Sequence, residues 1–203
     1  MRLILVRHGE SVGNFENRLQ GQHDYELTEL GREQSLRTAE RLAAMGASAL
    51  YSSPLSRALN TAETVAERLG VEARVLPALS EYHFGEMSGA TYREIRERFG
   101  AVANPAERVY PGEEGRDVFF KRVTEALWRI VEEHEGETVA VISHGGPIAL
   151  FTQSVLGLPY RRPMPFAISN CSLTLVDVEA ASGKGGAVLT RLNDTWHLRG
   201  LGE

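Results

Sequence analysis

The sequence has few of the features that would place a protein in a membrane or outside the cell. Cys171 is the only cysteine among 203 residues, so no disulfide can form within the chain. No apolar run approaches the ~20 residues that cross a bilayer. The run Leu3–Val6 is much shorter than the apolar part of a signal peptide. We therefore expect a cytoplasmic protein in which Cys171 is a buried thiol.

The chain also lacks an excess of positive charge and a pattern of metal ligands. Its 22 Lys and Arg residues are outnumbered by 27 Asp and Glu residues, and the net charge is −5. Nucleic acids and anionic membranes are bound through a basic face, so neither is expected as a partner. The six histidines are scattered, without an HExxH or CxxC pattern. The sequence therefore predicts no metal and no cofactor.

Helix and strand signals alternate along the chain without a linker, and 42% of the residues are hydrophobic. This predicts one α/β domain over residues 1–203, with a mostly helical insertion at about residues 77–136. Strands are expected at residues 3–6, 49–51, 73–76, 138–142, 172–178 and 187–192. Helices are expected at residues 30–45, 55–69, 91–99, 117–135 and 147–156, with Thr28 capping the first and Pro147 opening the last. Glycine-rich residues 182–186 are expected to form a hairpin turn.

Two of these apolar strands run directly into a histidine. The first is followed by Arg7, His8 and Gly9, and residues 138–142 are followed by Ser143 and His144. The carboxyl ends of parallel strands meet at one edge of a sheet, where ligands bind. We therefore expect His8 and His144 to face each other across one crevice, with Gly9 allowing close approach of the backbone. A capping arginine and a satisfied core histidine are the other interpretation of Arg7 and His8.

A third candidate cation, Arg57, lies at the start of the helix that follows the turn of residues 52–54. A helix N-terminus offers free amide donors and the positive end of a dipole. An arginine in that position suits a phosphoryl group, and a solvated helix arginine is the alternative.

Five short motifs follow one another in order along residues 3–150. They are Leu5-Val6-Arg7-His8-Gly9-Glu10-Ser11 with Asn14; Gln20-Gly21 with Asp24, Leu27, Thr28 and Gly31; Ser52-Ser53-Pro54-Leu55 with Arg57, Ala58, Thr61 and Ala62; Leu79 with Glu81, Gly85 and Gly89; and Ser143-His144-Gly145-Gly146. Together they resemble the histidine phosphatase superfamily, whose fold is phosphoglycerate-mutase-like. The resemblance implies an α/β protein, a three-layer α/β/α sandwich with a mostly parallel central sheet.

The resemblance also implies a phosphomonoester hydrolase that acts on a small phosphorylated metabolite. A phosphoryl group would be carried on His8, and Glu81 would be the proton donor. The implied catalytic residues are His8, Glu81, Arg7, Arg57 and His144. The implied phosphate- and substrate-binding residues are Arg7, Asn14, Gln20, Gly21, Arg57, His144 and Gly145. Phosphomonoester hydrolysis is among the slowest uncatalysed reactions, so several groups must act together.

Three departures separate the chain from the cofactor-dependent mutases of that family. Those mutases have an asparagine where this chain has Gly146 and a tyrosine where it has Phe84. They also carry basic residues that hold the substrate carboxylate, whereas residues 91–115 contain no Arg-Arg pair. A phosphatase is therefore expected. A phosphoglycerate mutase and a catalytically silent phosphate-binding member are the alternatives.

Several positions are open to two interpretations. Glu113 or Glu114 could replace the glutamate of a Gly-Glu-Ser motif that many of the phosphatases carry. A group of aromatic residues either lines a leaving-group pocket or packs the insertion onto the domain: Tyr82, His83, Phe84 and Tyr110. Arg161 and Arg162 are either a solvated pair or a second anion site. The sequence allows a homodimer without requiring one.

Overall fold

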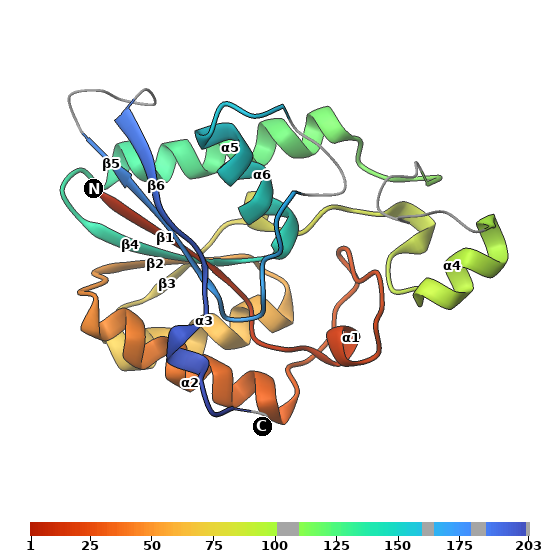
Figure 1. Cartoon of the computed structure of the whole chain (residues 1–203), viewed down its shortest axis with the longest axis horizontal. Coiled ribbons are helices and arrows are strands. Elements are labelled where there is room, and N and C mark those ends of the chain that lie inside the picture. The colour runs from red at the N-terminus through yellow and green to blue at the C-terminus, as the bar shows by residue number, and fades with distance from the viewer. Residues whose placement is uncertain (101–109, 160–164, 180–185, 202–203) are drawn as a thin grey trace.

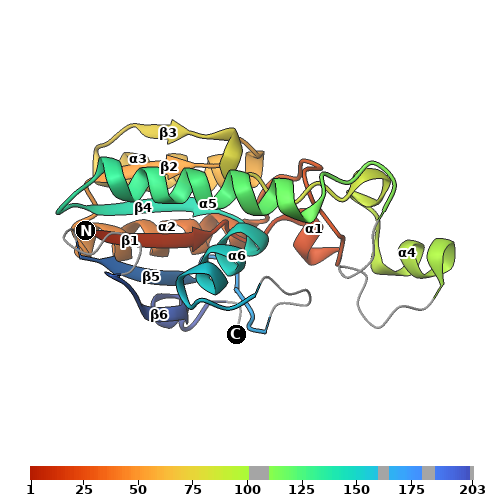
Figure 2. The same cartoon turned by 90° about the horizontal axis from the view of Figure 1, so that it is seen from above.

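A single mixed sheet forms the centre of the structure, a computed structural model that describes residues 1–100, 110–159, 165–179 and 186–201. In these residues six strands are hydrogen-bonded in the order β3-β2-β4-β1-β5-β6 (Figure 2). The strands are β1 (Arg2–Arg7), β2 (Ala49–Ser52), β3 (Ala73–Val75), β4 (Thr138–Ser143), β5 (Leu173–Val178) and β6 (Ala187–Asp194). The pairs β1–β4, β4–β2 and β2–β3 are parallel, while β5 is antiparallel to β1 and to β6. The predicted mostly parallel sheet is confirmed.

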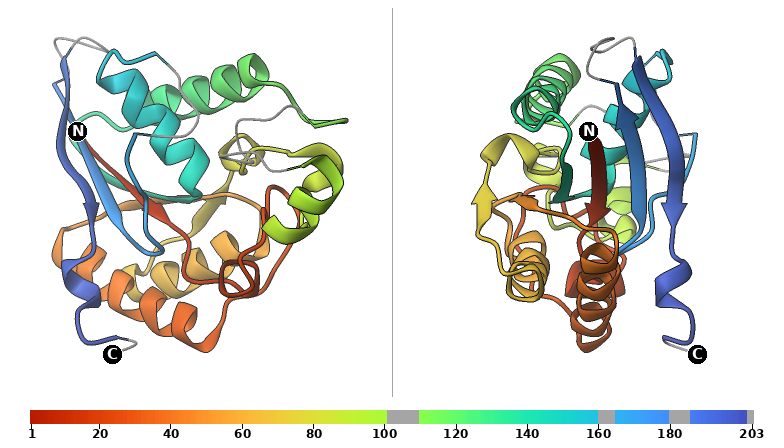
Figure 3. Two further views of the ribbon diagram at one scale, coloured as in Figure 1. Left: turned by 45° about the vertical axis from the view of Figure 1, so that its right-hand side comes forward. Right: turned by 90° about the vertical axis from the view of Figure 1, so that its left-hand side faces the viewer.

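Helices cover both faces of this sheet, which gives the predicted three layers (Figure 1 and Figure 3). One face carries α5 (Arg116–Glu133) and α6 (Gly145–Val155), and the other carries α2 (Glu29–Ala44) and α3 (Ser56–Leu69). Two shorter helices, α1 (Val12–Phe15) and α4 (Tyr92–Phe99), lie beyond the end of the sheet that is opposite the N-terminus (Figure 2). Short 3₁₀ helices complete the described elements: η1 (Pro77–Leu79), η2 (Gly85–Met87) and η5 (Trp196–Leu198).

The central strand β1 is apolar on both sides because both sides are buried. Leu3 and Leu5 join the core cluster that includes residues of α5 and α6. Ile4 and Val6 join the cluster that includes residues of α2 and α3. All four side chains have no exposed surface. The uninterrupted apolar run therefore reflects a strand covered by helices on each face, as predicted.

Two helix ends show the capping residues that helices prefer. The Thr28 side chain accepts a hydrogen bond from the backbone N–H of Gly31 at the start of α2, and Gly70 ends α3 with φ of 68°. α6 differs, since it begins at Gly145 and not at Pro147. His144 is the N-cap residue, and the missing N–H of Pro147 costs no hydrogen bond in the first turn.

One segment of the expected insertion has a different structure, while its long helix forms close to the predicted bounds. The loop expected at residues 77–90 contains the 3₁₀ helices η1 and η2. The α5 helix packs beside α6 in the layer above the sheet, with Phe119 and Leu127 in the core. The expected glycine turn lies almost wholly outside the described residues, although β5 and β6 pair antiparallel as a hairpin requires.

In the described ranges, none of the helices combines the length and apolar character needed to cross a membrane.

Candidate active site

The register of the parallel pair β1–β4 brings the two predicted histidines together. Arg7 is opposite Ser143 at the carboxyl ends of these strands. The next residue along β1, His8, donates its backbone N–H to the carbonyl of Ser143 at 3.0 Å. The imidazole rings of His8 and His144 then lie with their centroids 5.1 Å apart. The prediction that these histidines face each other is confirmed.

The contacts of His8 define which of its ring nitrogens is free to react. Nδ1 lies 2.7 Å from the carbonyl oxygen of Gly9, and Nε of Arg57 lies 3.3 Å from Nε2. A guanidinium can only donate, so Nε2 accepts and the ring proton is on Nδ1. Burial, followed by the charges of Arg57 and Arg7, lowers the pKa of His8 well below its ordinary value of 6.5. The ring is therefore neutral, with a lone pair on Nε2.

Arg57 is held in the first turn of α3 with 1% of its surface exposed. Its Nη2 donates to the carbonyl of Gly21 at 2.7 Å, and Nη1 donates to the carbonyl of His23 at 3.0 Å. Burial lowers its pKa to about 10, so the side chain keeps its charge at neutral pH. Next to Gly21, the side-chain oxygen of Gln20 accepts from the Ser11 hydroxyl at 2.8 Å. Gln20 and Gly21 thus support the site by binding Ser11 and Arg57.

Arg7 brings a second buried cation to the same place. Its Nη1 donates to the carbonyl of Ile168 at 2.6 Å, and burial lowers its pKa. The Nε atom is buried and has no hydrogen-bond partner among the described residues. A Cβ added at Gly145 would lie 3.9 Å from this Nε, which places Gly145 beside the guanidinium. In the described part of the chain, neither Arg7 nor Arg57 forms a salt bridge.

His144 is neutral for the same physical reasons as His8. Its Nε2 lies 2.8 Å from the hydroxyl of Ser53, and its Nδ1 is buried without a hydrogen-bond partner among the described residues. Burial lowers its pKa well below 6.5, and the positive charge of Arg57 acts in the same direction. Two neutral imidazoles and two guanidiniums therefore share one buried site.

The carboxyl of Glu81 lies at the start of α6, close to Arg7 and Arg57. Its Oε1 accepts the backbone N–H of Tyr82 at 2.8 Å, and its Oε2 accepts the N–H of Gly146 at 3.0 Å. A Cβ added at Gly146 would collide with Oε1, so glycine at this position leaves room for the carboxyl. The negative charge of Glu81 acts on both Arg7 and Arg57, where it opposes the effect of burial on the pKa.

Asn14 and Asn170 hydrogen-bond to backbone groups of Ser11 and His8. The side-chain oxygen of Asn14 accepts from the backbone N–H of Ser11 at 3.2 Å and from Nδ2 of Asn170 at 3.1 Å. The same Nδ2 donates to the carbonyl of His8 at 3.0 Å. The next residue, Cys171, is buried as predicted. Its backbone N–H donates to the carbonyl of Arg7 at 2.9 Å.

The structure resolves several of the open alternatives. Glu114 pairs with Arg122 at 2.8 Å, while Glu113 accepts the backbone N–H of Tyr110 at 3.1 Å. In the described residues, both carboxylates are therefore engaged by other groups of the protein. Tyr82, Phe84 and Tyr110 belong to the core cluster with exposed fractions of 7% or less, which favours packing over a leaving-group pocket. His83 is half-buried, and its Nδ1 accepts the backbone N–H of Gly85 at 3.0 Å. Arg161 and Arg162 lie outside the described residues.

Three residues of the site were missed by the sequence interpretation. Ser53 stands within one of the quoted motifs, and this signal could have identified it. Asn170 and Arg122 have no local pattern that distinguishes them from other polar residues. Packing also requires glycine at position 9, because a Cβ there would collide with the carbonyl of Gly31 at the start of α2. In the part of the chain that the structure describes, no group of three or more His, Cys, Asp or Glu residues could hold a metal ion.

Comparison with known proteins agrees with this geometry. Residues 3–195 match the model of the Histidine phosphatase superfamily (branch 1). The chain is 41% identical over 154 residues to phosphoglycerate mutase-like protein 4 of Arabidopsis thaliana, covering 72% of this chain and 67% of the relative. It is 30% identical over 204 residues to probable phosphoglycerate mutase GpmB of Salmonella paratyphi C, covering 98% of this chain and 95% of the relative. A solved mycobacterial glucosyl-3-phosphoglycerate phosphatase complexed with VO3 has a TM-score of 0.84 at 29% identity, over 96% of this chain and 99% of that one. The predicted resemblance is thereby confirmed, and the chain belongs to the histidine phosphatase superfamily.

Proposed function

We propose that this member of the superfamily is a phosphomonoester hydrolase that carries the phosphoryl group on Nε2 of His8. The observation that supports this most directly is the burial of Arg7 and Arg57 beside two neutral histidines. A buried charge without a partner costs several kcal/mol. A phosphoryl dianion supplies further negative charge, and its oxygens can pair with the forks of two guanidiniums.

In the first half-reaction, Nε2 of His8 attacks phosphorus and the bond to the leaving oxygen breaks. Arg7 and Arg57 hold the phosphoryl oxygens, and His144, Asn14 and Gly145 complete the phosphate site. Glu81 acts as the general acid of this step and gives a proton to the departing alkoxide. The preformed positive charge acts in a site shielded from water, where it stabilises the transferring group most.

In the second half-reaction, water attacks phosphorus and the bond to Nε2 of His8 breaks. Glu81, now ionised, takes a proton from the attacking water, and inorganic phosphate leaves. Gln20 and Gly21 support these steps through Ser11 and Arg57. The substrate is a small phosphorylated metabolite. The cytoplasmic location stays a prediction from the sequence, which allows a homodimer without requiring one.

Replacement of the nucleophile tests this proposal. His8→Ala should abolish release of phosphate while leaving the thermal unfolding transition in place. Rapid quenching of the wild-type reaction with ³²P-labelled substrate should trap an acid-labile, base-stable phosphoenzyme, which His8→Ala should not form. A variant that keeps most of the activity would remove His8 as the nucleophile. A wild-type protein without turnover on any of a broad set of phosphorylated metabolites would favour the silent phosphate-binding member.

A phosphoglycerate mutase is the second candidate, because the chain aligns over most of its length with a relative that carries this name. Isomer exchange requires the bisphosphate to stay bound while it reorients. Gly146, Phe84 and the absence of an Arg-Arg pair in residues 91–115 disfavour that retention. With 3-phosphoglycerate, inorganic phosphate should appear without formation of the 2-isomer, even when 2,3-bisphosphoglycerate is added. Isomerisation faster than phosphate release would establish the mutase.

A further inference from the structure

We propose that Arg122 and Glu114 are positioning residues that fix the carboxyl of Glu81 at the reacting phosphate. This inference rests on the proposed function, in which Glu81 transfers protons to and from oxygen. The two residues lie outside the five motifs, and Arg122 is 41 residues further along the chain than Glu81.

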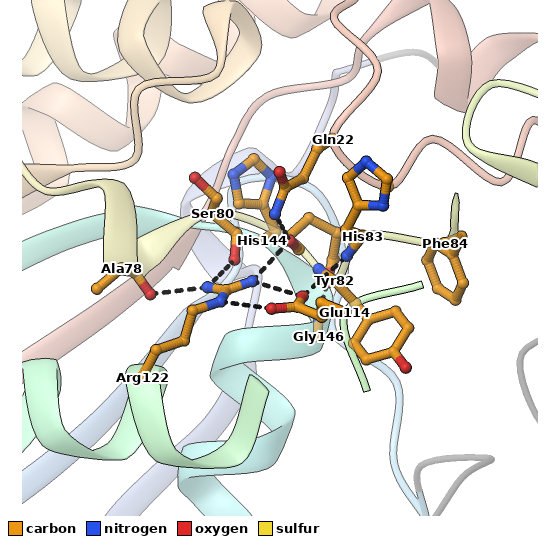
Figure 4. Close-up of polar contacts among 12 residues, drawn as sticks. Gln22, Ala78, Ser80, Tyr82, His83, Phe84, Glu114, Arg122, His144 and Gly146 are labelled. Carbon is orange, nitrogen blue, oxygen red and sulfur yellow. Dashed lines mark hydrogen bonds and ion pairs between the residues drawn. The ribbon is translucent and has the colours of Figure 1, made fainter. Parts of the chain in front are cut away.

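The guanidinium of Arg122 on α5 binds the backbone that leads up to Glu81, and Figure 4 shows it beside Ala78, Ser80 and Glu114. Nη1 donates to the carbonyl of Ala78 at 2.9 Å and to that of Ser80 at 2.8 Å. Nη2 donates to the carbonyl of Glu81 at 2.9 Å and to Oε1 of Glu114 at 2.8 Å. Nε donates to Oε2 of Glu114 at 2.8 Å. These five bonds use every N–H that an arginine side chain carries.

Side chains hold each backbone carbonyl from residue 78 to residue 81. The hydroxyl of Ser143, the residue before His144, donates to the carbonyl of Leu79 at 2.7 Å. Nε2 of Gln22 adds a second bond to the carbonyl of Glu81 at 3.0 Å. The segment therefore takes its shape from α5, from β4 and from the loop that also holds Arg57. A connection of this kind fixes the proton donor relative to the nucleophile.

Glu114 secures the other side of the same segment. Its Oε1 accepts the backbone N–H of His83 at 2.9 Å, and its own backbone N–H donates to the carbonyl of His83 at 3.2 Å. The side chains of Arg122 and Glu114 are 20% and 13% exposed. The pair is thus largely removed from water, unlike the exposed ion pairs that contribute little. The pair holds the guanidinium of Arg122 in the orientation in which it donates to the three carbonyls.

The carboxyl of Glu81 is set by two backbone amides, one of which lies in the segment that Arg122 and Glu114 hold. One amide belongs to Tyr82, between the residues held by Arg122 and Glu114, and the other belongs to Gly146 on α6. If the segment shifts, the carboxyl moves relative to the leaving oxygen while His8, Arg7 and Arg57 keep their own contacts. Loss of Arg122 should therefore impair proton transfer selectively and leave phosphoryl transfer to His8 intact.

Esters that differ in their need for a proton separate this role from a general effect on the fold. An alkyl phosphate such as glycerol 2-phosphate releases an alkoxide and needs the proton, whereas p-nitrophenyl phosphate releases a stable phenolate. Arg122→Gln should lower kcat/KM for the alkyl ester about 10²-fold, as expected for a displacement near 1 Å, and should change it only a few-fold for the aryl ester. Glu114→Gln should show the same split with a smaller loss. Arg129→Gln, which changes an exposed arginine of the same helix, should leave both rates unchanged.

Combination with Glu81→Gln completes the test. Glu81→Gln should itself show the split between esters, and the double variant Glu81→Gln/Arg122→Gln should lose no more activity on the alkyl ester than Glu81→Gln alone. If Glu81→Gln lost activity equally on both esters, the role of Glu81 in the proposed function would fail. If Glu81→Gln showed the split but Arg122→Gln did not, only the positioning proposal would fall.

A conservative variant guards against loss of the fold. Arg122→Lys keeps the apolar stem and the charge but cannot form the five-bond fork, so it should fold and still show the selective loss on the alkyl ester. Circular dichroism and the aryl ester rate report whether each variant is folded. If Arg122→Gln, Arg122→Lys and Glu114→Gln all failed to fold, the pair would serve the fold alone and the proposal would be overturned.

Discussion

Arg57 and His8 are joined by a hydrogen bond of 3.3 Å from Nε of the arginine to Nε2 of the histidine. This bond has two consequences. It fixes the ring proton on Nδ1, where the carbonyl of Gly9 accepts it at 2.7 Å. It also places a cation beside the atom that would carry the phosphoryl group. When Nε2 bonds to phosphorus, the same donor becomes available to a phosphoryl oxygen, so little rearrangement accompanies the transfer.

Activity should not depend on a metal ion, because Arg7 and Arg57 supply the positive charge in the proposed mechanism. Hydrolysis of p-nitrophenyl phosphate should be unchanged after incubation with excess EDTA and dialysis. Vanadate should inhibit strongly, since its five-coordinate adducts resemble the transferring phosphoryl group. Arg57→Gln should weaken inhibition by vanadate along with turnover. Loss of activity on chelation, with recovery on addition of zinc or magnesium, would overturn this mechanism.

The stability of the fold should decrease on acidification through the titration range of free histidine. The folded pKa values of His8 and His144 lie well below 6.5, while those of the unfolded chain are near this value. Below about pH 6.5 the unfolded chain therefore binds protons that the folded protein does not, and the free energy of unfolding falls by up to about 1.4 kcal/mol per pH unit for each histidine. Above that range both forms are neutral, and these groups contribute no pH dependence.

Urea unfolding at pH 7, 6 and 5 measures this effect. His8→Gln should remove the contribution of one histidine, so its unfolding free energy should fall less steeply with acidification by up to about 1.4 kcal/mol per pH unit. His144→Gln should do the same. Equal slopes in the wild type and both variants would show that neither histidine is held neutral by the fold.

The pairing of His8 with His144 could be predicted because a simple rule connects sequence to space. Each histidine follows an uninterrupted apolar strand, and parallel strands bring their carboxyl ends to one edge. Arg57 was found by a similar rule, since it occupies the first turn of a helix that begins after a strand. In both cases a local sequence pattern determines that the residue lies at the edge formed by the carboxyl ends of the parallel strands.

The supporting contacts could not be predicted in this way. Arg122 lies in an amphipathic helix in which nothing local separates a buried arginine from a solvated one. Its partners lie in a segment near Glu81 without helical or strand periodicity, so only the folded path of that segment brings them together. The start of α6 was misplaced for a related reason. Proline is a favoured first residue of a helix, which is why the helix was expected to begin at Pro147. In the structure the helix begins directly after β4, and the carboxyl of Glu81 accepts the N–H of Gly146 in its first turn.

Gly146 provides a direct test of the space that Glu81 occupies. In Gly146→Ala the added Cβ would collide with Oε1 of Glu81, so the carboxyl must leave its position at the start of α6. Alanine has a higher helix propensity than glycine, which offsets part of the lost contact, so the variant should stay folded with an unfolding temperature close to that of the wild type. At the same time kcat/KM for glycerol 2-phosphate should fall about 10²-fold, with a much smaller loss for p-nitrophenyl phosphate.

Gly145→Ala is the matched comparison, because its Cβ would meet Arg7 only at an ordinary contact distance of 3.9 Å and should cost less on the alkyl ester. Equal activity of Gly146→Ala and the wild type on both esters would show that proton transfer does not require Glu81 in this position.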